Sequence, residues 1–233
     1  MDADQHNAKD DDGATAGVAR ISALCELGVR TLPVDGVAVT LASGSRVAGL
    51  LATSDDLARR LDELQATLGE GPAIDAAAQH RPVLRADLAD RDSAARWPTF
   101  GPAAIGLGAR AVFALPLRIG VIDLGVVSLY RREPGELDSA ALARALRLTD
   151  AVAHAVLDLA QPATPAALLD FSRMLAGDYL GAEVHQASGM LMVQLGIPIE
   201  AALARLRAYA FARDLGLREV AREVVSGTLV LDN

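Results

Sequence analysis

The sequence has very little of the chemistry that metal sites and thiol enzymes need. Its 233 residues include one cysteine, Cys25, which excludes a disulfide within the chain, a CxxC redox pair and a thiolate zinc cage. The four histidines are scattered, without HxH or HExxH spacing. The GxGxxG, GxxxxGK(S/T) and GxSxG patterns are also missing. We therefore predict no catalytic residues, no metal site and no enzymatic activity. The sequence does not indicate which cofactor, if any, is bound.

Long apolar runs are missing as well. The longest, Ala103–Leu117, is interrupted by Arg110 and Pro116. It is shorter than the roughly 20 apolar residues of a membrane-spanning helix. Residues 1–12 are acidic, whereas a signal peptide begins with basic residues and continues with apolar ones. We therefore expect a cytoplasmic protein with no membrane partner.

Positive charge is scarce. The formal net charge is −8, and Lys9 is the only lysine among the basic residues. A protein that binds nucleic acid regardless of sequence needs an excess of cations to neutralise phosphates. Any nucleic-acid contact must therefore come from a local patch. The hydrophobic share of 52% is typical of a globular protein.

The first two thirds of the chain alternate between helical and strand-like patterns. Residues 1–14 are polar and acidic, which predicts a disordered tail. Periodicity and turn residues then predict helices over about 16–32, 56–68 and 138–160, and strands over 36–43, 46–53, 83–84, 111–117 and 124–130. Residues 69–72 are expected to form a turn, and residues 87–108 a long connection with little regular structure. This order predicts an α+β domain over 15–160, with an antiparallel sheet flanked by helices.

The C-terminal part is predicted to be entirely helical. Pro162 and Pro165 mark a linker over residues 161–178. Three helices are expected beyond it, over about 179–195, 199–213 and 217–225. Helices of this length with short loops suit a three-helix bundle over residues 179–230.

Two helices of this bundle carry charged side chains at regular spacing. Arg205, Tyr209 and Arg213 lie four residues apart, on a different face from an apolar stripe. Arg218 and Arg222 lie one turn apart on the last helix. Arginines contact phosphates and aromatic rings stack on unpaired bases, so this pattern suits an RNA loop. A solvated helix face remains the alternative.

Three sequence blocks in this region resemble the signature of an ANTAR domain: residues 183–195, 201–210 and 217–221. The resemblance implies a three-helix RNA-binding module that stabilises a two-hairpin antiterminator and acts as a homodimer. Many family members carry lysine where this chain has Ser188. We predict that the residues in contact with RNA are Gln186, Ser188, Arg205, Tyr209, Arg213, Arg218 and Arg222.

The upstream region is similar to the GAF domains that precede ANTAR modules in actinobacterial regulators. The similarity is carried by residues 68–72, by Arg96-Trp97-Pro98 and by residues 125–131. It implies a sensor or dimerisation domain whose sheet and connection 87–108 enclose a small-molecule pocket. A filled hydrophobic core is the alternative at that place. The resulting hypothesis is a signal-responsive antitermination regulator, in which the helix over 138–160 passes the signal to the RNA-binding domain.

Two other functions stay open. A DNA-binding regulator could use the helix over 217–225 as its recognition helix, although acidic residues flank it. An enzyme on a GAF-like fold, such as a sulfoxide reductase, would have to work with Cys25 alone.

Overall fold

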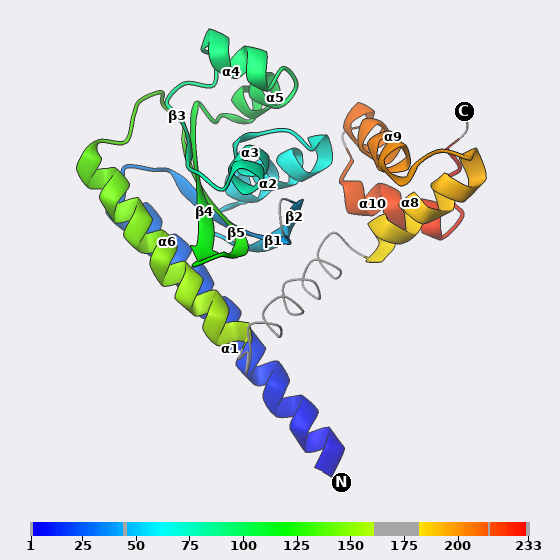
Figure 1. Ribbon diagram of the computed structural model, residues 1–233, viewed down its shortest axis with the longest axis horizontal. Helices are drawn as coiled ribbons and strands as arrows, with labels where there is room; N and C mark the ends of the chain where they lie inside the picture. The colour runs from blue at the N-terminus through cyan, green and yellow to red at the C-terminus, as the bar shows by residue number, and fades with distance from the viewer. Residues whose placement is uncertain (1, 44–45, 161–181, 214, 232–233) are drawn as a thin grey trace.

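The computed structural model describes residues 2–43, 46–160, 182–213 and 215–231. The predicted linker over 161–178 lies outside them. The N-terminal domain consists of α1 (Asp2–Thr31), β1 (Gly36–Ser43), β2 (Arg46–Thr53), α2 (Asp56–Leu68), α3 (Pro72–Gln79), β3 (Val83–Arg85), α4 (Arg91–Arg96), α5 (Phe100–Leu107), β4 (Ala111–Ile119), β5 (Ile122–Arg131) and α6 (Ser139–Ala160). The C-terminal bundle consists of α8 (Ala182–Leu195), α9 (Ile199–Ala212) and α10 (Leu217–Val225) (Figure 1).

The predicted antiparallel sheet is present, with five strands in the order β2-β1-β5-β4-β3. Helices cover both of its faces, α1 and α6 on one and α2 to α5 on the other (Figure 1). Strand β1 shows how the pleat divides the core, because Val37, Val39 and Leu41 belong to the cluster on the α1/α6 side. Ala38 and Ala42 belong to the cluster on the α2/α3 side. The sheet therefore separates two hydrophobic cores.

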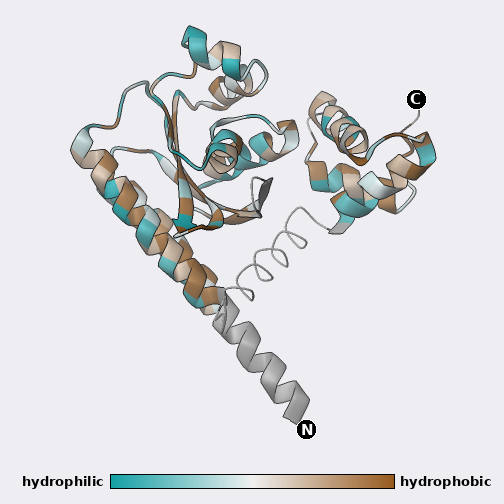
Figure 2. Ribbon diagram, in the orientation of Figure 1, coloured by the Kyte–Doolittle hydropathy of each residue, from teal (hydrophilic) through white to brown (hydrophobic). Residues whose placement is uncertain are grey.

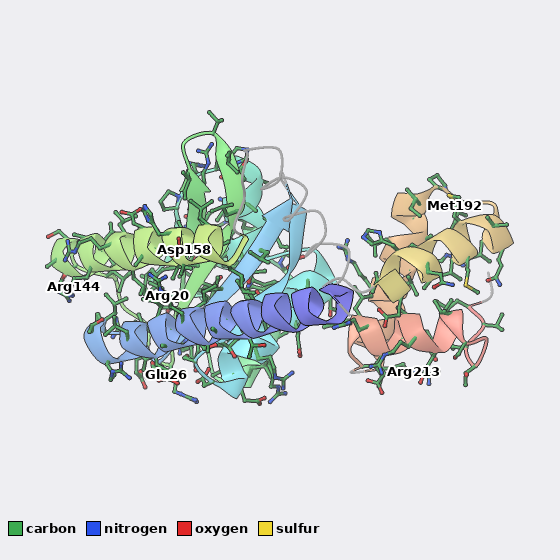
Figure 3. All side chains as sticks on the ribbon, turned by 90° about the horizontal axis from the view of Figure 1, so that it is seen from below. Arg20, Glu26, Arg144, Asp158, Met192 and Arg213 are labelled. Carbon is green, nitrogen blue, oxygen red and sulfur yellow. The ribbon has the colours of Figure 1, made fainter. Side chains whose placement is uncertain are left out.

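Helices α1 and α6 lie side by side along the sheet (Figure 3). The Arg20 guanidinium donates to the Asp158 carboxylate at 2.7 Å and joins the two helices. Gly17 allows their close approach, because a Cβ there would stand 2.5 Å from Cδ1 of Leu159. At the other end, Gly28 is in contact with Leu148. The two helices therefore run antiparallel, and the start of the domain lies beside its end.

Two local predictions were wrong. α1 begins at Asp2, where a disordered tail was expected over 1–14. Acidic residues near a helix N-terminus are favoured by the helix dipole, and the segment carries no proline to stop the helix.

None of the helices in the described part of the chain is both long and apolar enough to cross a membrane.

The connection over 87–108 is helical rather than irregular. α4 is capped by Asp90, whose carboxylate accepts from Ser93 N at 2.6 Å. α5 is capped from a distance, because the Glu70 carboxylate accepts from the backbone N–H groups of Thr99 and Phe100 at 2.8 and 2.7 Å. A cap supplied by a residue so far away in sequence cannot be recognised from the local pattern.

Hydropathy follows this division into layers. In α2, the apolar positions at helical spacing face the sheet, where Leu57 and Leu61 are buried. Polar residues occupy the other side of the helix (Figure 2). That polar side of α2 faces the C-terminal bundle, since α2 contacts both α9 and α10.

Candidate nucleic-acid interface

The C-terminal bundle is held together by a small core. The apolar spacing of each helix places aliphatic and alanine side chains toward the centre. The buried members are Val184, Ala187, Leu191, Ala202, Leu206, Ala210, Leu217, Val220, Ala221 and Val224. Small residues let the three helices approach closely, which fixes the positions of the polar side chains on the outer faces.

The arginine and tyrosine ladder on α9 is present on the surface. The Arg213 guanidinium lies over the Tyr209 ring, 5.1 Å from its centroid. Arg213 is exposed, whereas Tyr209 and Arg205 are half-buried. A cation over an aromatic face stabilises the pair by about 0.5–1 kcal/mol at an exposed site. The stacked guanidinium therefore offers a flat, charged surface beside the ring.

The two predicted residues on α8 differ in exposure. Gln186 is exposed. Ser188 is only 3% exposed, and its hydroxyl donates to the backbone carbonyl of Val184 at 2.7 Å. Ser188 lies one turn from both Val184 and Leu191, so it shares their inward face. The structure gives this serine a packing role and little surface for a partner.

The predicted arginines on α10 lie elsewhere. Arg218 and Arg222 are exposed, and a guanidinium nitrogen of Arg218 is 3.9 Å from the Glu183 carboxylate. Both line a cleft of about 480 Å³ whose opposite wall is α2. Arg205, Tyr209 and Arg213 do not line it. The structure thus separates the predicted contacts into an α9 ladder outside the cleft and an α10 pair that lines it.

Comparison with known proteins assigns this bundle. Residues 181–225 match the sequence model of the ANTAR domain. The C-terminal bundle is an ANTAR domain. The match to the family model covers all three helices that the sequence blocks indicated. A search of curated proteins found no match to the chain.

Solved structures resemble the N-terminal part. A GAF domain region of a protein from Geobacter sulfurreducens has a TM-score of 0.51 and 16% identity, and the match covers 62% of this chain and 95% of that one. A type II free methionine-R-sulfoxide reductase from Thermoplasma acidophilum has a TM-score of 0.47 and 15% identity, covering 63% of this chain and 96% of that one. The N-terminal domain has the GAF fold, so the chain joins a GAF-fold domain to an ANTAR domain.

One small cavity lies inside the GAF-fold domain. Between α2 and the sheet, a cavity of about 10 Å³ is lined by Asp62, Ser128 and Tyr130 among others. That volume is close to the space one water needs. The Ser128 hydroxyl is buried there without a hydrogen-bond partner. The described cavity is far smaller than the small-molecule pocket that the resemblance implies.

Two carboxyl groups line or approach this interior. The Thr40 hydroxyl donates to Asp62, which is buried, and burial raises the pKa of Asp62 to about 6. The Tyr130 hydroxyl donates to Asp55, and burial followed by this carboxylate raises the pKa of Tyr130. Both pairs are positioned by the first turns of α2, so α2 is tied to the sheet by polar contacts.

Thiol and metal chemistry find little support among the described residues. Cys25 is buried within the α1/α6 core, and burial raises the pKa of its thiol to about 12. It therefore remains a thiol near neutral pH and is a poor nucleophile. Within the part of the chain described here, no three His, Cys, Asp or Glu side chains cluster as metal ligands.

Sequence reasoning missed a second face of α9. Arg207 and Phe211 are two residues after Arg205 and Tyr209, which is about 200° around the helix axis. Arg207 lies against the C-terminal end of α2, since a Cβ built on Gly69 would stand 2.9 Å from its Nη1. Phe211 lines a second hollow, of about 380 Å³, opposite α2. The one signal in the sequence was a phenylalanine that follows an arginine by one helical turn.

Proposed function

We propose that the protein is a signal-responsive, RNA-binding transcription antitermination regulator. Its ANTAR domain binds a two-hairpin RNA, and its GAF-fold domain senses a signal or dimerises. The ANTAR match over 181–225 carries the proposal. The α9 ladder supports it, because the exposed Arg213 guanidinium stacked on the half-buried Tyr209 ring suits unpaired bases and phosphates.

Each surface residue has a role in this proposal. Arg205 and Arg213 pair with phosphates, and Tyr209 stacks on a splayed base. Gln186 contacts a base edge from α8. Arg218 and Arg222 add phosphate contacts from α10. Ser188 serves packing through its bond to Val184.

Fluorescence anisotropy with a labelled two-hairpin RNA tests this function. Arg205→Ala should weaken RNA binding about tenfold, the loss expected for one charge-assisted contact. Arg144→Ala is the matched control, because Arg144 is an exposed arginine on α6 of the GAF-fold domain (Figure 3). Equal losses in both variants, or a preference for duplex DNA of matched length, would contradict the proposal, the latter in favour of a DNA-binding regulator.

A small-molecule effector is part of the proposal. The cavity of about 10 Å³ beneath α2 is too small for a metabolite, so binding there requires α2 to move outward. α2 contacts α9 and α10, and its movement therefore reaches the ANTAR domain. This adds a second route to the one expected through α6. Breaking α6 with Ala153→Pro should abolish the response of RNA binding to the signal if α6 is needed.

The homodimer is a proposal as well. Leu27 on α1 and Leu146 on α6 are 41% and 43% exposed, at the end of the helix pair where Gly28 meets Leu148. Exposed leucines on adjacent helices suit a second copy of the same surface. Leu146→Arg should shift the mass measured by light scattering from dimer to monomer. An unchanged mass, with Arg147→Ala as control, would place any dimer elsewhere.

A further inference from the structure

The GAF-fold domain and the ANTAR domain touch through the polar side of α2. α2 contacts α9 and α10, and the bundle lies beside the α2 layer (Figure 1). The contact includes the end of α2, where Arg207 lies against Gly69. The last carbonyl groups of a helix carry partial negative charge, which favours a cation at this position. The end of α2 is therefore suited to hold Arg207.

The contact is incomplete on either side of Arg207. The cleft of about 480 Å³ separates Arg59 and Glu63 of α2 from Arg218 and Arg222 of α10. The hollow of about 380 Å³ separates Leu64 of α2 from Phe211. Two close-packed surfaces would leave no such spaces. The packing is therefore that of two surfaces that can part without exposing a hydrophobic core.

The charges of the cleft are mixed on both sides, because Arg59 and Glu63 of α2 line it together with Arg218, Glu219 and Arg222 of α10, and they do not lock the docked arrangement. Glu63 is already engaged, because Arg59 donates to it at 2.6 Å and also donates to Asp56. The carboxylate of Glu63 and the guanidinium groups of α10 nevertheless line the same cleft. Opposite charges across a space of this size attract, and the attraction weakens with salt. An RNA phosphate would compete for the same guanidinium groups.

The size of the cleft decides what can reach α10. A volume of about 480 Å³ suits a small molecule, whereas an RNA hairpin is far larger. Arg218 and Arg222 are thus closed to RNA on the α2 side, while the α9 ladder lies on the opposite side of its helix from Arg207. Moving α2 away would therefore widen the approach of RNA to the α10 arginines.

We propose that the polar face of α2 is a docking surface for the ANTAR domain of the same chain, and that docking restricts the approach of RNA to Arg218 and Arg222 from the α2 side. This rests on the proposed RNA-binding function. The protein then has a docked state, in which α2 limits the approach of RNA to α10, and an undocked state, in which the whole surface can be approached. Its apparent RNA affinity is reduced by the fraction of molecules that are docked.

Ala66 provides a test on the α2 side of the cleft and is not itself a predicted RNA contact. It lines the cleft and is half-buried, and arginine and glutamate are both good helix formers. Ala66→Arg adds a cation opposite α10 and should separate the domains. Ala66→Glu has a similar length and the opposite charge, so it should preserve docking.

Two measurements on the full-length variants distinguish the outcomes. Small-angle X-ray scattering should show a larger radius of gyration for Ala66→Arg than for the wild type or Ala66→Glu. Anisotropy should show about tenfold tighter RNA binding for Ala66→Arg, as expected if about nine tenths of the wild type is docked. The gain should disappear when Arg218→Ala and Arg222→Ala are added, whereas a gain made by the new cation itself would survive.

Each other result has a defined meaning. An unchanged radius of gyration in Ala66→Arg, or a larger radius with unchanged RNA affinity, would overturn the docking proposal. A gain that survives removal of both α10 arginines would overturn it too. If scattering shows opening but no variant binds RNA, the proposed RNA function fails while the docking surface stands.

Discussion

The two domains of this chain bury their hydrophobic side chains in different ways. The GAF-fold domain buries large side chains on both faces of its sheet, including Trp97, Phe100 and Phe113. The ANTAR domain has one small core, in which alanines such as Ala187 and Ala202 are fully buried beside a few aliphatic residues. Domains of this size bury a smaller fraction of their surface and are less stable. The smaller domain therefore depends more on its neighbour, and the larger one can act as a platform.

Trp97 offers the strongest test of the platform. Its ring packs edge-to-face with Phe100 at a centroid distance of 6.3 Å, and its indole N–H donates to Asp75 at 3.1 Å. Trp97→Ala should lower the free energy of unfolding of the GAF-fold domain by about 3–5 kcal/mol, as for large buried aromatic residues. Differential scanning calorimetry should show the transition of that domain moving to lower temperature. A single transition that moves as one unit would mean that the domains unfold together.

Leu206 provides the corresponding test in the ANTAR domain. It is fully buried at the centre of the bundle. Leu206→Ala should cost about 3 kcal/mol, a larger share of the stability of a small domain. Far-UV circular dichroism should report loss of the bundle, while the fluorescence of Trp97, the only tryptophan, should stay native. A change in that fluorescence would show that the GAF-fold domain needs the bundle in order to fold.

Asp62 should make the stability of the GAF-fold domain depend on pH in a way that the ANTAR domain does not share. Burial raises its pKa from 3.8 to about 6, so the folded state holds this proton more tightly than the unfolded state does. The stability of the GAF-fold domain should therefore fall as pH rises from about 4 to 6, and then level off. Asp62→Asn should remove this slope and add about 3 kcal/mol at pH 7, while the Thr40 hydroxyl keeps an acceptor. Urea titrations at pH 4.5 and 7, followed by Trp97 fluorescence, measure both effects. If the free energy of unfolding changed by the same amount between these pH values in the wild type and in Asp62→Asn, the expectation would be contradicted.

Two glycines give the smallest and most direct comparison. Gly69 and Gly196 both follow a helix with positive φ, 66° and 64°. Alanine at either position should cost about 1 kcal/mol, because a side chain disfavours this conformation. Only at Gly69 would the new methyl group meet another domain, at Nη1 of Arg207, whereas Gly196 has open space around it. Gly69→Ala alone should therefore also increase RNA affinity, by roughly twofold if it weakens docking by a few tenths of a kcal/mol. Equal RNA affinities in the two variants would show that this contact does not restrain the ANTAR domain.

The sequence predicts elements well where local signals are complete. α2 was expected over 56–68 and has those bounds, with Asp55 as its N-cap and Gly69 as its C-cap. α10 was expected over 217–225 and has those bounds as well. Both helices have a strong apolar stripe and clear end signals. The strands were placed correctly because β-branched runs alternate with turn residues.

The missed helices lack those signals. α3 begins at Pro72, a favourable first position, but the glycine and proline around it predicted only a turn. α5 depends on the Glu70 carboxylate, which comes from a distant turn. Both are short, and their form is decided by tertiary contacts.

The candidate interface was predictable only in part. Helical spacing correctly brought Arg213 next to Tyr209 at the end of α9. It could not show that Ser188 points inward, since that depends on how α8 packs against the other helices. Nor could it show that Arg218 and Arg222 face α2, because no local pattern encodes the arrangement of two domains.

The antiparallel pairing of α1 and α6 has a consequence for how this protein could be rebuilt. Because Gly17 meets Leu159, the backbone comes into the GAF-fold domain and leaves it at neighbouring points. Domains whose two ends lie close together can be transplanted as cassettes, since the host chain has only a short gap to bridge. Residues 15–160 are thus a candidate interchangeable input unit. A different sensor with the same spacing between its ends could be grafted onto the ANTAR domain, although only a graft that recreates the polar face of α2 would carry over its restraint.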